Sequence, residues 1–279
     1  MIHSTEINRQ LALFQKALMA NEKSSATIEK YLRDTAAFLT YADGRPITKE
    51  CAISYKSHLI AQGYAIRSIN SMLASVNSYL SFLGLSNDKV KALRFQHQAY
   101  CAENKELTKA EYLRLLQAAQ GHERLYLVLQ TICSTGIRIS ELQYFTVEAI
   151  MKNKIVVYCK SKVRIILIPG KLKHLLLNYA RRQKIHSGAV FLTRSGKHLD
   201  RSNIWAQMKA LCAAADVNPS KVFPHNLRKL FARTFHEVEK DLAKLADVLG
   251  HSSIDTTRIY IETTGAEHQK RIDRLGLII

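Results

Sequence analysis

The first hundred residues carry apolar side chains at intervals of three and four, the spacing that places them on one face of an α-helix. Four segments show this pattern, and residues that start or stop helices separate them. Ser24 precedes the second segment, Thr48 can cap the third, and Gly63 ends it. We therefore expect an all-helical domain over residues 1–95.

The fourth helical segment has one apolar face and an opposite face of small polar groups. The polar face consists of Arg67, Ser68, Asn70, Ser71, Ser75, Asn77 and Ser78. Short hydroxyl and amide groups can approach a sugar-phosphate backbone closely and donate hydrogen bonds to its oxygens. The sequence leaves two interpretations open, a nucleic-acid contact and a plain solvated surface.

Helical periodicity fades before residues 96–106, which have the composition of a linker. Thr108 and Glu111 then match a capping box, in which a side chain at each end of the first turn bonds the other's backbone N–H. This signal predicts a new helix and a second domain over residues 107–279.

The second domain mixes helical and strand patterns. Two β-prone runs, Ile155–Tyr158 and Val163–Ile168, are separated by only Cys159-Lys160-Ser161-Lys162, a spacing typical of a tight hairpin with lysines at its tip. Helical patterns resume at about residues 171–184 and 202–215. The expected fold is mainly α with a small β-sheet.

The formal net charge of +18 and the isoelectric point near 9.8 indicate a polyanionic partner, with nucleic acid as the first candidate. Most of this charge follows residue 104. No apolar run approaches the roughly 18 residues of a membrane span, and no signal-peptide core follows Met1. We therefore expect a nucleic acid, and not a membrane, as the partner.

The cysteines are odd in number and contain no C-x-x-C pair, which disfavours both a disulfide framework and a cysteine zinc site. They are Cys51, Cys101, Cys133, Cys159 and Cys212. The histidines show no metal-ligand spacing such as H-E-x-x-H. We therefore expect a reducing, cytoplasmic location, no metal and no cofactor.

Near the chain end, a helical stripe closes on Gly250, which suits the left-handed position after a helix. His251 lies in the turn, and Ser252 or Ser253 can cap a helix that carries Tyr260 about two turns in. A phenol has a free pKa near ~10, so it needs positive partners to act as a nucleophile at neutral pH.

Other basic side chains also stand at the predicted element boundaries. Arg138 follows the helix-ending Gly136, and Ser140 starts a further predicted helix. His225 and Arg228 are three residues apart and share one face of a helix that begins after Phe223-Pro224.

Together these residues resemble the tyrosine recombinase and integrase family, especially its small Xer-type members. The matches are Thr135-Gly136-Ile137-Arg138-Ile139-Ser140-Glu141-Leu142, the hairpin lysine Lys160, His225-x-x-Arg228, and Leu249-Gly250-His251 followed nine residues later by Tyr260. The resemblance implies an all-helical core-binding domain joined to a mixed α/β catalytic domain. It also implies a site-specific recombinase of double-stranded DNA that works through a 3′-phosphotyrosine intermediate and a Holliday junction. The active assembly would be a tetramer on two DNA sites.

The resemblance assigns a chemical role to each matched residue. Tyr260 would attack the phosphorus and remain as a phosphotyrosine. Arg138 and Arg228 would hold the non-bridging oxygens, since guanidinium groups are permanently charged bidentate donors. Lys160 would protonate the leaving 5′ oxygen. His225 would move the tyrosine proton, and His251 would bind the phosphate or orient Tyr260.

The sequence departs from the family pattern at two places. The hairpin turn is short and Ser161 stands where Gly is frequent, so Lys162 competes with the favoured Lys160 as general acid. Lys229 stands where a second His is frequent. Glu141 is expected to hold either Arg138 or the local fold, and not to take part in chemistry.

Three further alternatives stay open. The apolar tail, about residues 265–279, docks either on its own domain or on a neighbouring protomer. A related recombinase or accessory protein can be a partner. A type IB topoisomerase and a non-catalytic DNA-binding regulator are the rival functions.

Overall fold

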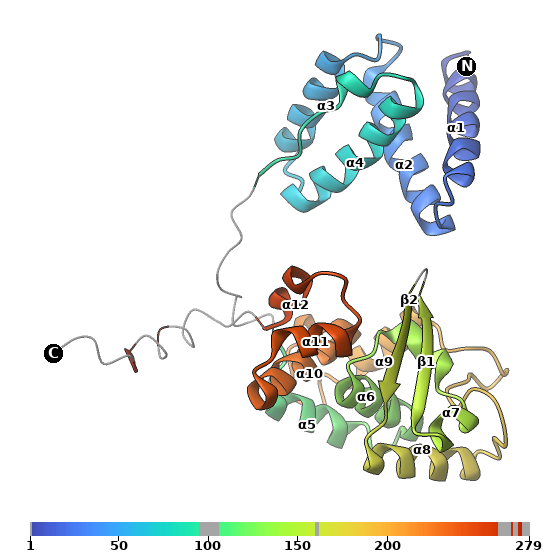
Figure 1. The fold of residues 1–279 in the computed structure, drawn as a ribbon, viewed down its shortest axis with the longest axis vertical. Helices are drawn as coiled ribbons and strands as arrows, with labels where there is room; N and C mark the ends of the chain where they lie inside the picture. Colours follow the sequence, from blue (N-terminus) through green and yellow to red (C-terminus); the bar gives the residue numbers. More distant parts are fainter. Residues whose placement is uncertain (1, 95–105, 160–161, 262–268, 270–272, 275–279) are drawn as a thin grey trace. The chain divides into compact units, whose positions relative to one another are not determined.

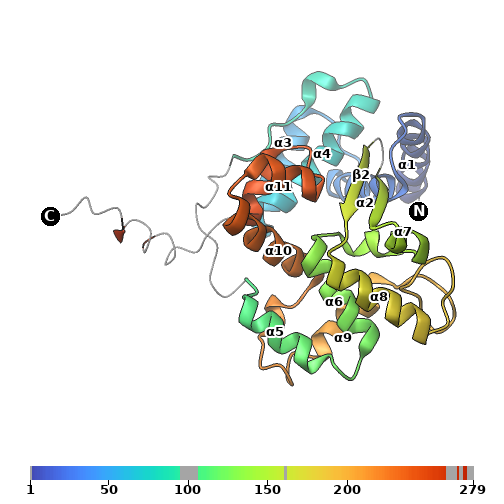
Figure 2. The same ribbon diagram turned by 60° about the horizontal axis from the view of Figure 1, so that its bottom comes forward.

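A computed structural model describes residues 2–94, 106–159, 162–261, 269, 273 and 274 of the chain. The chain divides into two compact units, Met1–His97 and Gln98–Ile279, each with its own core (Figures 1 and 2). The predicted linker, residues 96–106, lies outside the described residues apart from Glu106.

The first unit is helical throughout its described part. Its elements are α1 (Ile2–Ala20), α2 (Ser25–Ala42), α3 (Lys49–Ala61), α4 (Ile66–Phe82) and the short 3₁₀ helix η1 (Ser86–Asp88). Thr48 caps α3 by accepting from the Cys51 N–H, as predicted. Helix α2 packs on both α1 and α4, and the apolar side chains between them are buried.

The polar face of α4 is largely a clamp for the chain that follows it. The Asn70 side chain donates to the Leu93 carbonyl at 2.9 Å and accepts from the Leu93 N–H at 2.7 Å. Asn77 makes the same pair of bonds with Val90, both at 2.9 Å. Asn70 and Asn77 thus form neither a nucleic-acid contact nor a plain solvated surface, and both interpretations are wrong for them, because their side-chain amides bond the backbone of the following segment.

Ser75, on the same face, is buried and donates to Asp34 at 3.0 Å. Lys30 donates to the same carboxylate at 2.6 Å. This contact joins α2 to α4. Only Arg67, Ser68 and Ser71 of the predicted polar surface are exposed to solvent.

The second unit is mixed. Its elements are α5 (Lys109–Ala118), α6 (Glu123–Thr135), η3 (Ile139–Tyr144), α7 (Val147–Met151), β1 (Lys154–Cys159), β2 (Lys162–Leu167), α8 (Gly170–Arg182), α9 (Arg201–Ala210), η4 (Pro219–Lys221), α10 (Pro224–Glu239), α11 (Leu242–Leu249) and α12 (Ile254–Ile261). The predicted capping box of Thr108 and Glu111 starts α5. Helix α6 is buried along most of its length and packs against α10, α8 and α9.

The hairpin is tighter than the sequence suggested. Strands β1 and β2 are antiparallel, with Cys159 opposite Lys162, so two residues and not four separate the strands. Lys162 thus belongs to β2, while Lys160 lies outside the described residues.

Two other predictions differ from the structure. The helix predicted to start at Ser140 is a six-residue 3₁₀ helix, Ile139–Tyr144, which begins one residue earlier. Thr146 then caps a separate short helix, α7. Helix α9 ends at Ala210, before the predicted residue 215. Within the ranges that the structure describes, no helix is long and apolar enough to cross a membrane.

Candidate active site

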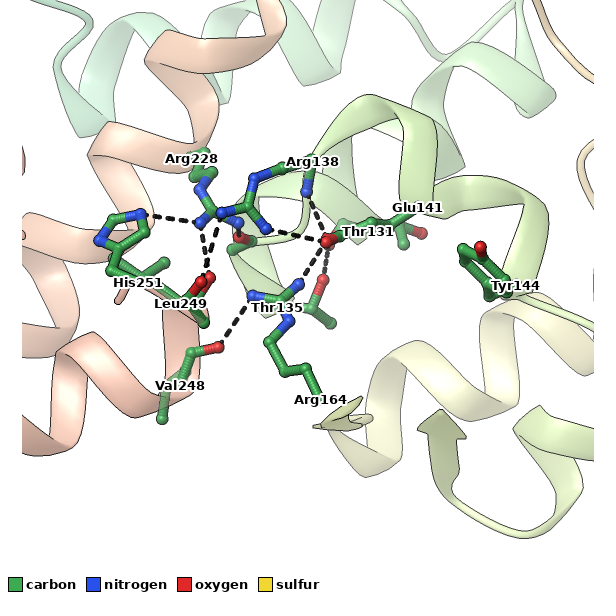
Figure 3. Close-up of polar contacts among 12 residues, drawn as sticks. Thr131, Thr135, Arg138, Glu141, Tyr144, Arg164, Arg228, Val248, Leu249 and His251 are labelled. Carbon is green, nitrogen blue, oxygen red and sulfur yellow. Dashed lines mark hydrogen bonds and ion pairs between the residues drawn. The ribbon is translucent and has the colours of Figure 1, made fainter. Parts of the chain in front are cut away.

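Five of the six predicted site residues come together in the second unit, at the ends of separate elements. They are Arg138 before η3, His225 and Arg228 in the first turns of α10, His251 in the turn after α11, and Tyr260 in α12. Figure 3 labels Arg138, Arg228 and His251 among them. The sixth, Lys160, lies outside the described residues.

Gly136 sets the path of the chain into the site. It ends α6 in the left-handed conformation, with φ of +61°, and a Cβ there would lie 2.3 Å from the Phe231 ring. Only glycine combines this backbone angle with so close a neighbour. The Gly136 carbonyl accepts from Nη1 of Arg228, so the same turn that leads to Arg138 also fixes the second arginine.

Arg228 is the most buried cation of the site, with 1% of its surface exposed. Its Nη2 donates to the Leu249 carbonyl at 2.7 Å and lies 3.0 Å from Nε2 of His251. Burial, followed by the nearby charge of Arg138, lowers the pKa of Arg228 to about 10, which keeps it charged at neutral pH. Its buried Nε–H has no acceptor within the described part of the chain.

Arg138 is more open, with 41% of its side chain exposed. Its Nη1 donates to Oε1 of Glu141 at 3.0 Å, and its backbone N–H donates to Oε2 of the same carboxylate at 2.7 Å. Glu141 therefore holds Arg138, one of the two roles expected for it. Arg138 also lines a cleft, so its exposed part is available to an anion.

A third guanidinium, Arg164 on β2, completes the cluster. Its Nη2 pairs with Oε2 of Glu141, and its Nη1 donates to the Val248 carbonyl at 3.0 Å. The turn at Gly250 lies against it, because a Cβ on Gly250 would lie 2.5 Å from Cδ of Arg164. Sequence reasoning missed Arg164, whose partners are 23 and 84 residues away along the chain.

The three arginines converge on the carboxyl end of α11. Arg164, Arg228 and Arg138 donate to the carbonyls of residues 248, 249 and 250, the last at 3.5 Å. The last carbonyls of a helix lack intrahelical donors and carry partial negative charge, so cations are stabilised there. The helix end thus gathers three like charges that would otherwise repel one another.

His251 is held by both ring nitrogens. Nδ1 lies 2.9 Å from Oγ1 of the buried Thr257, and Nε2 faces Arg228. Because a guanidinium only donates, Nε2 must accept and the ring proton stands on Nδ1. Burial, followed by the charges of Arg228 and Arg138, lowers the pKa of His251 to about 4, so the ring is neutral at pH 7. Sequence reasoning missed the role of Thr257, which no motif indicates.

Tyr260 lies between the two histidines. Its ring centroid is 5.0 Å from that of His225 and 4.9 Å from that of His251, and Cζ of Arg228 lies 5.8 Å from it. Tyr260 is 7% exposed, whereas His225 is open to solvent. Desolvation, followed by the charges of Lys229 and Arg228, lowers the pKa of His225.

A cleft of about 830 Å³ opens beside these residues and is lined by Arg138, His225 and Arg228 among others. Tyr260 lies against the His225 ring, and His251 lies against the Arg228 guanidinium. The arrangement suits an anionic substrate such as a phosphodiester. In the described residues, no group of three or more His, Cys, Asp or Glu side chains is arranged to hold a metal ion.

Comparison with known proteins now decides the family. The model of the phage integrase family matches residues 105–267, and that of the phage integrase N-terminal SAM-like domain matches residues 11–86. The chain belongs to the phage integrase family. This integrase-family chain is a tyrosine-type recombinase, which confirms the predicted family and enzyme class.

Curated relatives of this recombinase span nearly the whole chain. It is 30% identical to tyrosine recombinase XerA of Pyrococcus furiosus, over 95% of this chain and 93% of that protein. It is 31% identical to tyrosine recombinase XerD of Halalkalibacterium halodurans, over 92% of each. Its fold is also similar to that of the integrase chain in the structure of a lambda integrase tetramer bound to a Holliday junction. The TM-score is 0.70 and the identity 18%, and the match covers 92% of this chain and 78% of that chain. The predicted fold class is confirmed: the chain is mainly α with a small β-sheet, and an all-helical first domain, which matches the SAM-like family model, precedes a mixed α/β integrase catalytic domain.

Proposed function

We propose that this recombinase cuts and rejoins duplex DNA at a specific site, with Tyr260 as the nucleophile. The observation that carries the proposal is the position of the Tyr260 ring between His225 and His251 and beside Arg228. A phenol needs both a proton acceptor and positive charge to attack at neutral pH.

In this reaction, the Tyr260 oxygen bonds to phosphorus while the bond from phosphorus to the 5′ oxygen breaks. The products are a 3′-phosphotyrosine and a 5′-hydroxyl, so the phosphoester linkage is kept for religation. His225, neutral and open to the cleft, takes the tyrosine proton. His251 binds the phosphate or orients Tyr260.

Arg138 and Arg228 stabilise the charge that grows on the non-bridging oxygens. Arg138 presents its exposed face to the cleft, and Arg228 supplies the Nε–H that lacks an acceptor in the described chain. A buried donor without a partner is unfavourable, and a phosphate oxygen would supply the missing acceptor.

The leaving 5′ oxygen takes its proton from a hairpin lysine. Lys160 is the favoured donor and Lys162 the alternative. A duplex with sulfur in place of the 5′ bridging oxygen separates them, since a thiolate leaves without a proton. When the true donor is replaced by Ala, the variant should cleave the sulfur-containing duplex at the native rate. The same variant should cleave the ordinary duplex at least about 100-fold more slowly than the native chain does.

The active assembly is a tetramer of this chain on two DNA sites, which exchanges strands through a Holliday junction. An apolar groove of about 440 Å³ on α5, α6 and α10 can receive an apolar segment, and is lined by Tyr112, Leu113, Phe231, Phe235 and Val238 among others. The tail, about residues 265–279, would dock there, in cis or from a neighbouring protomer. Deletion of residues 276–279 should weaken synapsis, the joining of two DNA sites in one complex, if the tail is exchanged between protomers. It should leave synapsis unchanged if the tail docks on its own domain.

The test uses a pool of nicked duplexes with a randomised central stretch, because a nick beside the cleavage point traps the covalent adduct. The native chain should select one duplex and form an adduct stable to denaturant. Tyr260→Phe should form none, whereas Tyr126→Phe, on α6 away from the site, should react at the native rate.

Three results would contradict the proposal. These are no adduct from the native chain, an adduct that survives Tyr260→Phe, and relaxation of supercoiled plasmid without sequence preference. The first indicates a DNA-binding regulator, and the last indicates a topoisomerase.

A further inference from the structure

One carboxylate serves two guanidinium groups in this site. Glu141 has 2% of its side chain exposed, and its two oxygens divide the work. Oε1 accepts from Arg138, while Oε2 accepts from Arg164 and from the Arg138 backbone N–H (Figure 3). A single negative charge is therefore shared between two cations, which leaves one positive charge in excess.

We propose that Arg164 is a positioning residue for Arg138: by taking one oxygen of Glu141, it keeps the Arg138 guanidinium free to face the substrate phosphate. The inference rests on the proposed function, since it needs an anionic phosphate in the cleft. Arg164 itself does not face the substrate, because 9% of its side chain is exposed and its Nη1 is bound to the Val248 carbonyl.

The physical reason lies in how guanidinium and carboxylate groups pair. With both oxygens available, a carboxylate and an arginine form two parallel hydrogen bonds, and their charges cancel locally. Without the Arg164 charge, Arg138 would be the only guanidinium paired with the Glu141 carboxylate. The arginine would then turn both of its terminal nitrogens to the carboxylate and present less charge to the phosphate.

The position of Arg164 is fixed from outside the pair. The Val248 carbonyl anchors one nitrogen, and the bare Cα of Gly250 leaves room for the side-chain stem. Because β2 and the end of α11 both hold Arg164, it cannot follow Arg138 toward the cleft. One arginine is thus tethered, and the other remains able to bind.

The test compares single-turnover cleavage by Arg164→Met and Arg164→Lys with that of the native chain. The probe is the nicked duplex that the native chain selects by covalent capture. Arg181→Met, at the exposed end of α8, is the matched control, since it also removes one positive charge. Arg164→Met should slow cleavage roughly 10- to 100-fold, while its DNA affinity should change less than about 3-fold. Arg164→Lys should recover part of the rate. Arg181→Met should cleave at the native rate.

Two further measurements distinguish positioning from plain destabilisation. In an Arg138→Met background, Arg164→Met should cause no further loss, because a residue that acts through another has no effect once the other is gone. A methylphosphonate at the cleavage point removes the phosphate charge. On that duplex, Arg164→Met and the native chain should differ by less than about 3-fold, since the charge that Arg138 stabilises is absent.

Additive losses in the double variant, or an equal loss on both duplexes, would overturn the inference, because the defect would then not pass through Arg138. An Arg164→Met rate equal to that of Arg181→Met would also overturn it. All three outcomes leave the proposed function standing, since the native chain still forms its adduct. Absence of an adduct from the native chain removes the proposed function and this inference together.

Discussion

The two units hold their backbones with different chemistry. In the first unit, Asn70 and Asn77 each bond one backbone N–H and one carbonyl, so every polar group in the clamp is paired and neutral. In the second unit, arginines donate to backbone carbonyls and keep their charge. An amide clamp is complete by itself, whereas a guanidinium clamp retains positive charge that an anionic ligand can use.

The largest effect should follow from Arg228→Met. The substitution leaves three acceptors without their donor and removes a charge from the phosphate site. We expect at least about a 10³-fold loss of single-turnover cleavage. Urea denaturation should also show a loss of about 3 kcal/mol in the free energy of unfolding. Native-like cleavage would show that this arginine only supports the fold.

A matched pair of glycines sharpens the comparison. Gly63 and Gly250 both have positive φ, but an added Cβ at Gly63 has no atom within 4 Å, whereas at Gly250 it collides with Arg164. Gly63→Ala should lower the free energy of unfolding by about 1 kcal/mol. Gly250→Ala should lower it by about 2 to 4 kcal/mol and slow cleavage as well. Equal losses in urea denaturation would show that Arg164 moves aside freely.

The amide clamp should affect stability alone. Asn77→Ala leaves the Val90 N–H and carbonyl without their side-chain partner, and should lower the free energy of unfolding by about 1 to 2 kcal/mol. Cleavage of the selected duplex should stay within about 2-fold of native, since no charge is lost. Ser68→Ala, exposed on the same helix, is the control. A large rate loss from Asn77→Ala would remove the contrast between the units.

The smallest effect is a loss of stability in acid. The pKa of His251 is about 4 in the folded chain and near 6.5 when unfolded, so the unfolded state binds more protons between these values. Stability is therefore full above pH 6.5 and falls as the pH is lowered toward 4. Urea denaturation at pH 7 and pH 5 should show a difference of order 1 kcal/mol after solvent screening. His251→Gln should reduce it, and an unchanged slope would assign the acid sensitivity elsewhere.

Local signals made part of this structure predictable. Gly136 and Gly250 mark helix ends, and Thr108 with Glu111 forms a capping box, because these features depend on neighbours within a few residues. The fold class and family followed from such signals and from the order of the matched motifs. The end of α9 at Ala210 did not, since the apolar spacing that predicted this helix continues through Leu211, Cys212 and Ala215.

Features that depend on distant partners were not predictable. Asn77 bonds a residue 13 positions away, and Arg164 bonds one 84 positions away, so neither has a pattern within its own element. Both side chains are also common on solvated surfaces, which hides their role. The catalytic roles of the site residues, Lys160 among them, stay predictions until the variants are measured.

The anchors of the arginine cluster have a consequence for how such a chain can diverge. The main-chain oxygens of the last two residues of α11 and of Gly250 in the turn after it fix the separation of the three charged groups, so the backbone of this helix end sets that separation. Side chains at positions 248 and 249 can therefore be exchanged for others that pack without altering that separation. An inserted or deleted residue in α11 would instead rotate the oxygens and disperse all three charges at once.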